Sequence, residues 1–413
     1  MERRRVVVTG MGCVSPIGLN VSQSWESAKA GVCGIAPITA YDTAEMKIKL
    51  AAEVKGFQPE SYIEKREARK LDRFSQLALA AACQAMEQSG LDSRKPDPYR
   101  CGVSVSSGIG GLSTLQLGCL KGLERGYDKV SPYFIPMIIG NMASAQIAIR
   151  YGLKGMATCP TTACAGGTNA IGDAFRYIRD GYAEVMVCGG AEACINSLGI
   201  GGFTSMQALS TAEDPKRASI PFDKERNGFV MGEGAGILVL EELEYARDRG
   251  ARILGEVVGY GATCDAYHMT APAPDGAPGA RAMELALEDG GVAPEQVGYI
   301  NAHGTSTPMN DRCETMAVRL AFGAQAEKLA MSSTKSMTGH LLGAAGGVEA
   351  IFTLMALQEG FVPPTIGYQV PDPECDLDIV PNVGRKAEIQ YAMSNSLGFG
   401  GHNASILLRR WEE

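Results

Sequence analysis

The sequence lacks any apolar run long enough to span a membrane. A basic start, Arg3-Arg4-Arg5, precedes the short apolar run Val6-Val7-Val8, but this run is too short for the core of a signal peptide. We therefore expect the segment to form a first buried strand. We also expect the protein to lie in the cytoplasm, away from membranes.

Regular cysteine spacing is also absent. The chain has 12 cysteines, but they are scattered and form no Cys-x-x-Cys pair. This pattern argues against a disulfide framework and against the common zinc motifs. Without an export signal, it predicts reduced thiols in a cytoplasmic protein.

Charge is sparse as well, since charged residues make up only 20% of the chain. The 46 acidic residues outnumber the 38 basic ones, and the net charge of −8 argues against a nucleic-acid-binding surface. The exception is a basic stripe formed by Lys65, Arg66, Arg69 and Lys70, with Arg73 one helical turn further on. The stripe is either a solvated helix face with internal salt bridges or a dock for an acidic partner.

What the chain does contain fits a compact globular protein. Its 413 residues are 45% hydrophobic and include 51 glycines, as expected for many tight turns. Short β-branched strands are predicted at 5–9, 103–106, 184–188, 236–240, 253–260, 297–301 and 405–408. Helices are predicted at 71–89, 170–178, 280–287 and 347–358. Apolar strands that alternate with helices indicate an α/β protein whose sheet is covered on both faces.

A faint internal repeat is also present. Two segments of the first part of the chain resemble two of the second part in the same order, namely 165–171 with 345–351 and 234–238 with 403–407. The repeat predicts a duplicated fold. We place its halves at residues 1–250 and 251–413, and we expect insertions at 40–75 and 110–140 to cover the functional site.

Cys164 stands where a short extended run gives way to an amphipathic helix. A single cysteine of a cysteine-rich chain is more often structural. A helix N-terminus, however, offers unpaired N–H groups and about half a positive charge, and both favour thiolate over thiol. We therefore expect Cys164 to be a reactive nucleophile.

Two of the 4 histidines lie in glycine-rich, polar surroundings. His303 precedes Gly304, and His340 follows Gly339 in a run that begins at Lys335. A core histidine would more often have apolar neighbours, so this setting indicates site chemistry. We expect the duplicated fold to bring both histidines of the second half to Cys164 of the first.

Such a trio suits acyl transfer followed by carbon–carbon bond formation. A cysteine takes an acyl group from a thioester almost thermoneutrally. Two imidazoles that donate from Nε2 can stabilise the enolate formed when a carboxylate leaves as CO₂, so no cofactor is required. A cysteine–histidine hydrolase is an alternative, but it needs access for water and a base that activates it.

Other polar residues are expected to support this site. The glycine-rich segment 394–403 is mobile by composition and is expected to supply a backbone N–H beside Cys164, although a hairpin before the last strand is an equal alternative. The buried-charge candidates are Asp311, Glu314, Lys335 and Glu349. We expect Lys335 to pair with carboxylates and to fix His340.

Four motifs give the chain a family resemblance. Thr162-Ala163-Cys164-Ala165, His303-Gly304-Thr305, the run from Lys335 to His340, and Gly398-Phe399-Gly400-Gly401 look like the signatures of the β-ketoacyl-acyl-carrier-protein synthases. The match covers essentially the whole chain, and the complete Cys-His-His set is most similar to that of the elongating members. The resemblance implies a thiolase-like duplicated fold, layered α/β/α/β/α, with two mixed five-stranded sheets.

The resemblance also implies residue roles. Cys164 would carry the acyl chain, His303 and His340 would promote decarboxylation of a malonyl thioester, and the N–H groups of Cys164 and Phe399 would form an oxyanion hole. Phe399 would also gate the acyl pocket. Matches to the family's phosphopantetheine contacts are Thr270, Thr305 and Thr307, and matches to its acyl tunnel are Ile109, Phe134 and Phe203.

The family's partners follow from the same resemblance. Acyl-carrier protein is acidic, which favours the docking interpretation of the basic stripe, and a homodimer is expected. A structural sodium or potassium ion, seen in some members, would be held by Asn301, Glu349, Ser394 and Asn395. One departure is His402, where many members have threonine. His268, beside Thr270, receives no catalytic role.

Three related classes compete with this interpretation. A thiolase would need a second cysteine in a late Cys-Gly-Gly motif, where this chain has Gly398-Phe399-Gly400-Gly401. The non-catalytic chain-length partner of aromatic polyketide systems lacks the nucleophile that Cys164 supplies. A ketosynthase of a type II polyketide pathway stays open as the alternative to fatty acid elongation.

Overall fold

The computed structural model describes residues 3–91 and 96–412. Within this part of the chain, ten strands form one hydrogen-bonded sheet in the order β10-β9-β13-β14-β8-β1-β7-β6-β4-β5. The first five strands are β1 (Val6–Val14), β4 (Cys101–Ser106), β5 (Ala157–Thr158), β6 (Val185–Glu192) and β7 (Gly234–Glu242). The other five are β8 (Gly255–Cys264), β9 (Val297–Asn301), β10 (Ala330–Ser332), β13 (Tyr391–Gly398) and β14 (His402–Arg409).

The strand order shows the duplication. In each half the first strand pairs with the last, the last with the fourth, the fourth with the second and the second with the third. The pairs β4–β5 and β4–β6 are parallel and the pairs of β7 are antiparallel, and the second half repeats this arrangement. The predicted mixed, duplicated α/β fold is therefore confirmed. The two five-stranded sheets are not separate, however, because β1 and β8 join them through three antiparallel residue pairs.

Helices form the remaining layers. α7 (Gly166–Arg179) and α14 (Ala345–Glu359) pack against each other and against strands of both halves, so they form the central layer. α3 (Arg73–Ser89) and α6 (Met142–Tyr151) cover the outer face of the first half, and α11 (Ala277–Gly290) and α12 (Pro308–Phe322) cover that of the second. Almost all of α14 is buried, as its nearly continuous apolar sequence requires.

Shorter elements complete the chain. The remaining helices are α1 (Val21–Lys29), α2 (Lys65–Ala68), α4 (Leu112–Arg125), α5 (Phe134–Ile138), α8 (Ser197–Ser205), α9 (Pro215–Ala218), α10 (Leu243–Asp248) and α13 (Lys335–Thr338). The short strands are β2 (Ala36–Pro37), β3 (Leu50–Ala51), β11 (Phe361–Val362) and β12 (Arg385–Lys386). Single 3₁₀ turns lie at Pro59–Ser61, Pro98–Arg100, Tyr127–Lys129, Ala163–Ala165, Pro294–Gln296, Gly323–Glu327 and Leu342–Ala344. None of the helices in the described ranges is long and apolar enough to cross a bilayer.

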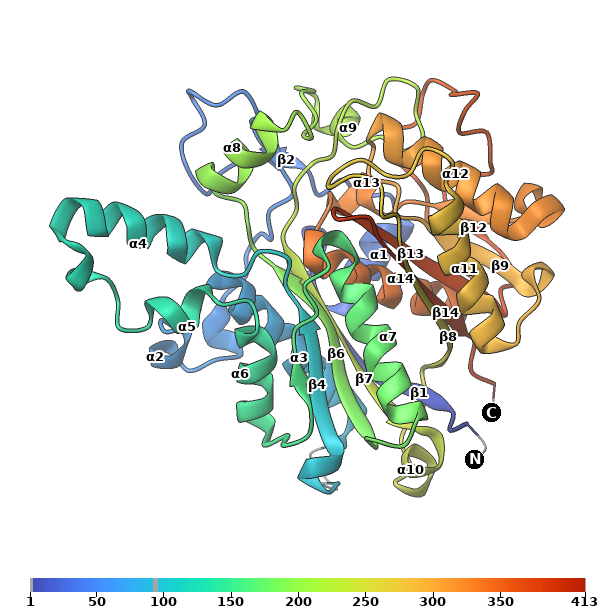
Figure 1. Cartoon of the computed structure of the whole chain (residues 1–413), viewed down its shortest axis with the longest axis horizontal. Coiled ribbons are helices and arrows are strands. Elements are labelled where there is room, and N and C mark those ends of the chain that lie inside the picture. The colour runs from blue at the N-terminus through green and yellow to red at the C-terminus, as the bar shows by residue number, and fades with distance from the viewer. Residues whose placement is uncertain (1–2, 92–95, 413) are drawn as a thin grey trace.

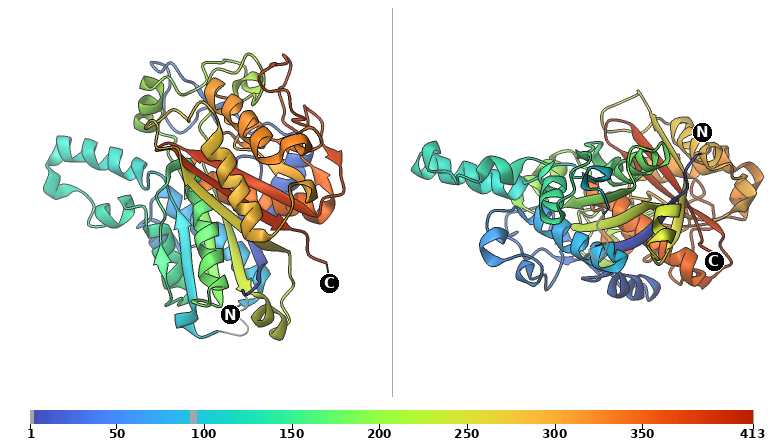
Figure 2. Two further views of the ribbon diagram at one scale, coloured as in Figure 1. Left: turned by 45° about the vertical axis from the view of Figure 1, so that its right-hand side comes forward. Right: turned by 90° about the horizontal axis from the view of Figure 1, so that it is seen from below.

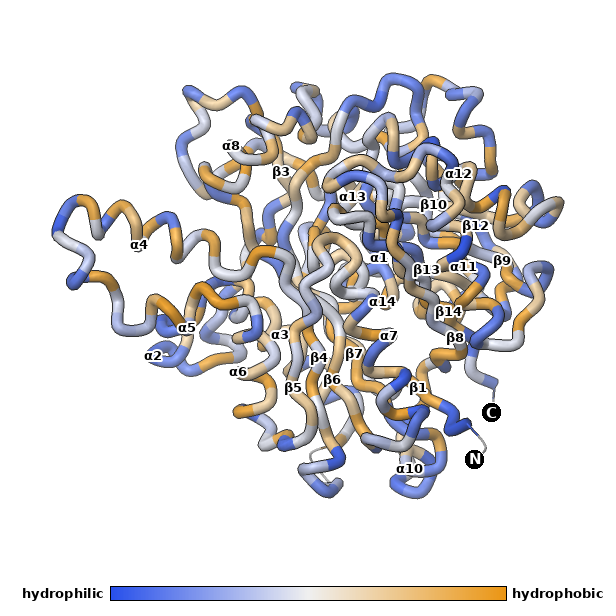
Figure 3. Tube along the Cα trace, in the orientation of Figure 1, coloured by the Kyte–Doolittle hydropathy of each residue, from blue (hydrophilic) through white to orange (hydrophobic). Residues whose placement is uncertain are grey.

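α4 and α5 form an arm that projects from the first half (Figures 1 and 2). Apolar side chains along the arm face outward, and Leu117, Leu120, Leu123 and Ile135 are each more than half exposed. Figure 3 shows apolar stretches continuing along the arm. The predicted insertion at 110–140 therefore extends away from the body of the protein. Within the other insertion, Tyr41, Met46 and Ile48 join the apolar cluster that includes Cys164.

The segment 394–403 forms the hairpin that the sequence left open as the alternative to a mobile loop, because Ser394 to Gly398 belong to β13 and pair with β14 across a tight turn. The basic stripe does not continue to Arg73 on one helix. Asp72 caps a new helix by accepting from the backbone N–H of Phe74, and Arg73 pairs instead with the buried Glu233 at 2.7 Å.

Candidate active site

Cys164, His303 and His340 line one cavity of about 560 Å³ between the two halves. Cys164 comes from the turn before α7, His303 from the loop after β9, and His340 from the segment after α13. Five further residues singled out in the sequence also line the cavity, and these are Ile109, Phe203, Thr270, Thr305 and Thr307. Phe399 lies in the same wall. The fold thus assembles one pocket from widely separated segments.

The backbone around Cys164 is tightly turned. Ala163 takes a left-handed conformation with φ 49°, and Leu342 has the same φ before α14, so the two halves repeat this turn. Gly398 of β13 lies so close that an added Cβ would stand 2.8 Å from the Thr162 carbonyl oxygen and 3.1 Å from the Cys164 nitrogen. The close approach lets the backbone N–H of Phe399 and that of Cys164 itself donate to the sulfur. Two donors therefore meet at the nucleophile.

The thiol does not have the low pKa expected from its place at a helix start. Cys164 is only 8% exposed, and burial raises the pKa of its thiol to about 12. Lys335 and the N–H groups at the sulfur oppose this shift without reversing it. At this buried position the cost of desolvating the anion exceeds these favourable interactions. The role of Cys164 as the reactive nucleophile stays a prediction.

His303 is held by its backbone. The N–H groups of His303 and Gly304 each donate to the carboxylate of Glu314 at 2.7 Å. Glu314 is buried on α12, and burial raises the pKa of its carboxyl to about 7. Gly304 has φ 31°, and an added Cβ would meet the Ser333 side chain at 2.6 Å. These contacts fix the turn that carries the imidazole.

His340 is anchored on the opposite side. Its N–H donates to the Val230 carbonyl at 2.7 Å, and its own carbonyl accepts from Gly232 at 2.8 Å. The rings of His303 and His340 lie 5.2 Å apart at 87°, and the Phe229 ring packs edge-on against His340 at 5.3 Å. The two imidazoles are therefore neighbours held by separate parts of the chain.

Both imidazoles are neutral. Burial lowers the pKa of His303 and that of His340 well below the usual value, and the nearby charge of Lys335 lowers both further. The Nδ1 atoms are buried without a hydrogen-bond partner in the described part of the chain. A neutral ring protonated on Nε2 leaves no buried N–H unpaired. This tautomer, assigned on that ground, gives two Nε2 donors for a ligand in the cavity.

Lys335 lies behind the cavity and not in its wall. Only 1% exposed, it forms a buried ion pair with Glu349 of α14. The second Glu349 oxygen, the Asn301 Oδ1 and the Ser394 Oγ are buried with no partner among the described residues. Asn395 lies next to Ser394 and accepts from Ser405 at 2.8 Å. Unpaired buried oxygens are suited to a hard cation.

One residue that was predicted for the acyl pocket lies elsewhere. Phe134 does not line the cavity of this chain. It lies in the arm on α5, where an added Cβ on Gly118 of α4 would stand 2.3 Å from its ring. Asp311 lies beside the cavity and accepts from the Phe222 N–H at 2.8 Å.

Two further residues at the site, one in the pocket wall and one behind it, carried no signal that singled them out in the sequence. Phe229 links Phe203 to His340 through ring contacts of 5.3 Å each. Glu192 is fully buried and accepts from Gly108 at 2.7 Å and from Gly343 at 3.1 Å, so it joins the loop of Ile109 to the second half. Both come from segments without a motif. The one available signal was a lone acidic residue at the end of the apolar run that forms β6.

The duplicated fold, with a cysteine at the start of one central helix and two neutral histidines opposite it, defines a cysteine-dependent acyltransferase of the condensing type. Comparison of sequences gives the family. Residues 3–246 match the N-terminal domain of the β-ketoacyl synthases and residues 254–369 match their C-terminal domain. The chain belongs to the β-ketoacyl synthase family.

Curated relatives and solved structures agree with this assignment. The chain is 51% identical over 411 residues to a 3-oxoacyl-[acyl-carrier-protein] synthase 2 of Staphylococcus aureus (strain COL), covering 100% of this chain and 99% of the relative. It is 51% identical over 413 residues to the protein of the same name from Synechocystis sp., again covering 100% and 99%. A β-ketoacyl synthase from Burkholderia phymatum STM815 superposes with a TM-score of 0.92 at 35% identity, covering 99% of this chain and 100% of that one. A type II polyketide ketosynthase, solved with its acyl-carrier protein and bound to the hexaketide, gives 0.91 at 35% identity with the same coverage.

Proposed function

We propose that the chain elongates fatty acids by condensing malonyl-acyl-carrier protein with an acyl group carried on Cys164. The observation that carries the proposal is the single cavity in which Cys164 meets His303 and His340. Full-length identity of 51% to 3-oxoacyl-[acyl-carrier-protein] synthases supports fatty acid elongation as its setting.

The first half of the reaction loads the enzyme. The Cys164 sulfur attacks the thioester carbonyl of the acyl carrier, the N–H groups of Cys164 and Phe399 stabilise the oxyanion, and the carrier thiol leaves with the proton of the Cys164 thiol. The acyl transfer is close to thermoneutral because one thioester replaces another.

The second half makes the carbon–carbon bond. Nε2 donors of His303 and His340 hold the malonyl thioester oxygen, and its carboxylate leaves as CO₂ to give an enolate. The enolate carbon attacks the acyl carbonyl on Cys164. The C–S bond then breaks, the thiolate takes up one proton, and β-ketoacyl-carrier is released. Burial keeps both imidazoles neutral in their role as donors, because it lowers the pKa of each ring, and the nearby charge of Lys335 adds to this effect.

Substrate choice tests the proposed function. Turnover should be measured with a series of saturated acyl carriers and malonyl carrier. We expect each condensation to stop after one two-carbon extension and to accept saturated chains, because a fatty acid elongase releases its product for reduction. Repeated extension of one unreduced chain would instead assign the protein to a type II polyketide pathway, the class of one structural neighbour.

The basic stripe is the proposed dock for the acidic carrier. Lys65, Arg66 and Arg69 are exposed, whereas Lys70 is half-buried, pairs with Glu67 at 2.6 Å and lies over the Tyr133 ring. The neighbour solved with its acyl-carrier protein supports a carrier partner for this fold.

Charge reversal tests this dock. We expect Lys65→Glu with Arg69→Glu to raise the KM for the carrier about tenfold while leaving kcat nearly unchanged, because rim charges act mainly on encounter. Steady-state kinetics at low and high salt would measure the effect. The matched control is Arg252→Glu, which reverses the charge of an exposed arginine outside the basic stripe. Equal KM values for the two variants would show that the basic stripe is a solvated helix face and not a dock.

A homodimer is part of the proposal. The exposed leucines and isoleucine of the arm support it, and in such a dimer Phe134 can approach the acyl pocket of the second copy.

A structural sodium or potassium ion is also part of the proposal. The unpaired oxygens of Asn301, Glu349 and Ser394, with Asn395 beside them, fit such an ion, which would neutralise buried negative charge there. The reaction itself requires no cofactor. Free thiols at all twelve cysteines suit the reducing cytoplasm.

A further inference from the structure

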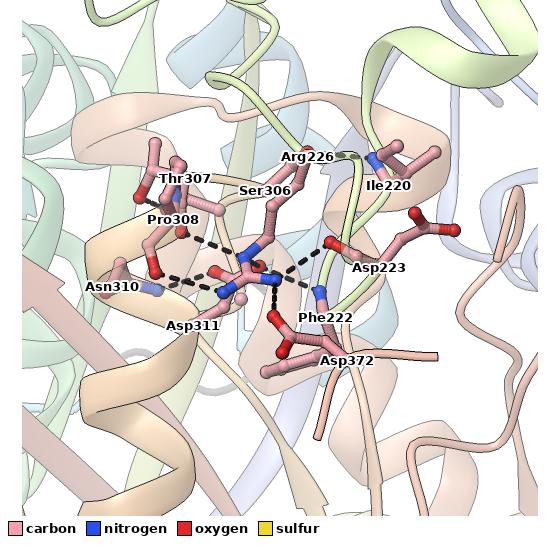
Figure 4. Close-up of polar contacts among 12 residues, drawn as sticks. Ile220, Phe222, Asp223, Arg226, Ser306, Thr307, Pro308, Asn310, Asp311 and Asp372 are labelled. Atoms are coloured by element: carbon pink, nitrogen blue, oxygen red, sulfur yellow. Dashed lines mark hydrogen bonds and ion pairs between the residues drawn. The ribbon is translucent and has the colours of Figure 1, made fainter. Parts of the chain in front are cut away.

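A buried ionic cluster lies beside the cavity, with Arg226 at its centre (Figure 4). Arg226 is 6% exposed, and the carboxylates around it, Asp223, Asp311 and Asp372, are all buried. The proposed reaction uses none of these four side chains. A buried guanidinium must be fully hydrogen-bonded to be tolerated, so its partners show what it organises.

Two of the partners of Arg226 are backbone carbonyls of the cavity wall. Its Nη2 donates to the Pro308 carbonyl at 3.0 Å, and its Nε donates to the Thr307 carbonyl at 3.4 Å. Its Nη1 donates to the Asp223 carbonyl at 2.8 Å and to the carboxylate of Asp372. Asp311 adds a carboxylate oxygen 3.5 Å from Nε. One side chain thus connects three chain segments.

The stretch of wall next to Arg226, Thr305 to Pro308, contains a strained backbone conformation that its hydrogen bonds hold in place. Ser306 has φ 68°, a left-handed conformation that is costly for a residue other than glycine. Its Oγ accepts from the Ile220 N–H at 2.9 Å, and its carbonyl accepts from Gly228 at 3.1 Å. The segment that follows, Thr307 and Pro308, is fixed by Arg226 (Figure 4).

Arg226 also begins a neighbouring stretch of the cavity wall. The residues after it, Asn227, Gly228 and Phe229, line the cavity, and Phe229 packs against His340. Thr305 and Thr307 also line the cavity and hydrogen-bond to each other at 2.9 Å, and the Gly228 N–H donates to the Ser306 carbonyl between them at 3.1 Å. Two adjoining stretches of the wall therefore meet at one guanidinium.

We propose that Arg226 is a positioning residue that holds these two stretches of wall in place for the pantetheine arm of the substrate. The inference rests on the proposed function, since it assumes a carrier-bound thioester. Glu314 holds the backbone of His303, and none of the contacts of Arg226 in the described part of the chain is to either residue, so we expect the His303 donor to be kept when Arg226 changes. Lysine cannot replace arginine here, because three donors on one nitrogen cannot reach partners spread around a planar fork.

Arg217 provides a matched control. It pairs with Asp223 of the same cluster at 3.0 Å and with Glu225 at 2.6 Å, but none of its contacts in the described part of the chain reaches the wall from Thr305 to Pro308. Arg217→Lys therefore changes the contacts of Asp223 but leaves the hydrogen bonds of Arg226 to the wall in place. A purely structural role for Arg226 predicts similar behaviour of the two variants.

The test compares two malonyl thioesters on the same preparation of each variant. One is malonyl-carrier and the other is malonyl-N-acetylcysteamine, which lacks most of the pantetheine arm, and CO₂ release is measured for both. We expect Arg226→Lys to lower the ratio of the two kcat/KM values about tenfold, mainly through the KM for malonyl-carrier. Any misfolded fraction cancels from this ratio. We expect Arg217→Lys to leave the ratio unchanged.

Two results would overturn the inference about Arg226, and a third would contradict the proposed function. An unchanged ratio in Arg226→Lys, with a wild-type enzyme active on malonyl-carrier, would overturn the inference alone. An equal fall of the ratio in Arg217→Lys would assign the effect to the cluster as a whole and would also overturn it. A wild-type enzyme that releases no CO₂ from malonyl-carrier would instead contradict the proposed function.

Discussion

Replacing Cys164 by alanine is expected to abolish acyl transfer and condensation, with a loss of roughly 10⁴–10⁶-fold. The side chain is the sole group at the start of α7 that can form a thioester, and the N–H donors of Cys164 and Phe399 have no other acceptor to stabilise. Intact-protein mass spectrometry after incubation with acyl carrier would check the result. The wild type should gain the mass of one acyl group and the variant should gain none.

Two controls make this result specific. Cys188→Ala removes another buried cysteine, outside the cavity, and should still acquire the acyl group. The Cys164→Ala protein should also still release CO₂ from malonyl-carrier, because His303 and His340 retain their N–H donors. An acyl adduct on the alanine variant would move the nucleophile to another residue.

Removing either histidine is expected to separate the two halves of the reaction. His303→Ala or His340→Ala should still become acylated on Cys164 but should condense roughly 10²–10³-fold more slowly, the usual cost of losing one donor to an oxyanion. The rings are 5.2 Å apart and neutral, so each supplies one N–H and neither replaces the other. Release of CO₂ and formation of β-ketoacyl-carrier should fall together.

Conservative variants sharpen the test. Asparagine can donate a hydrogen bond from roughly the place of an imidazole nitrogen, so His303→Asn and His340→Asn should recover part of the loss. Phe229→Leu, which changes the packing of His340 but no donor, should have a smaller effect. Unimpaired condensation by His340→Ala would remove that residue from the mechanism.

The sequence predicted most of the chemistry because the chemistry depends on local motifs. Cys164, His303 and His340 stand in short glycine-rich segments, and glycine permits tight turns with positive φ such as those at Gly304 and Gly339. The repeated turn before α7 and α14 was visible for the same reason. The sequence repeat pairs Ala165 with Ala345, whereas in the structure the two helices begin at Gly166 and Ala345, a shift of one residue.

Properties that depend on tertiary packing were not predictable in this way. β5 and β10 have two and three residues, too few for a periodic signal, and β13 carries the buried polar residues Ser394, Asn395 and Ser396, so it lacks the apolar pattern of a buried strand. The raised pKa of the Cys164 thiol was not predictable because a helix start is a local feature, whereas desolvation comes from the whole pocket. Arg226 and Glu192 become functional candidates only through partners distant in the chain.

The most direct test of the account is a chase experiment on acylated His340→Ala. The variant is loaded with acyl carrier, freed of excess substrate, and mixed with malonyl-carrier while its intact mass is followed. The account predicts that the acyl mass stays on Cys164 long after the wild type has discharged it into β-ketoacyl-carrier. Discharge at the wild-type rate, or failure of the variant to load at all, would contradict a division of labour between the thiol and the paired imidazoles.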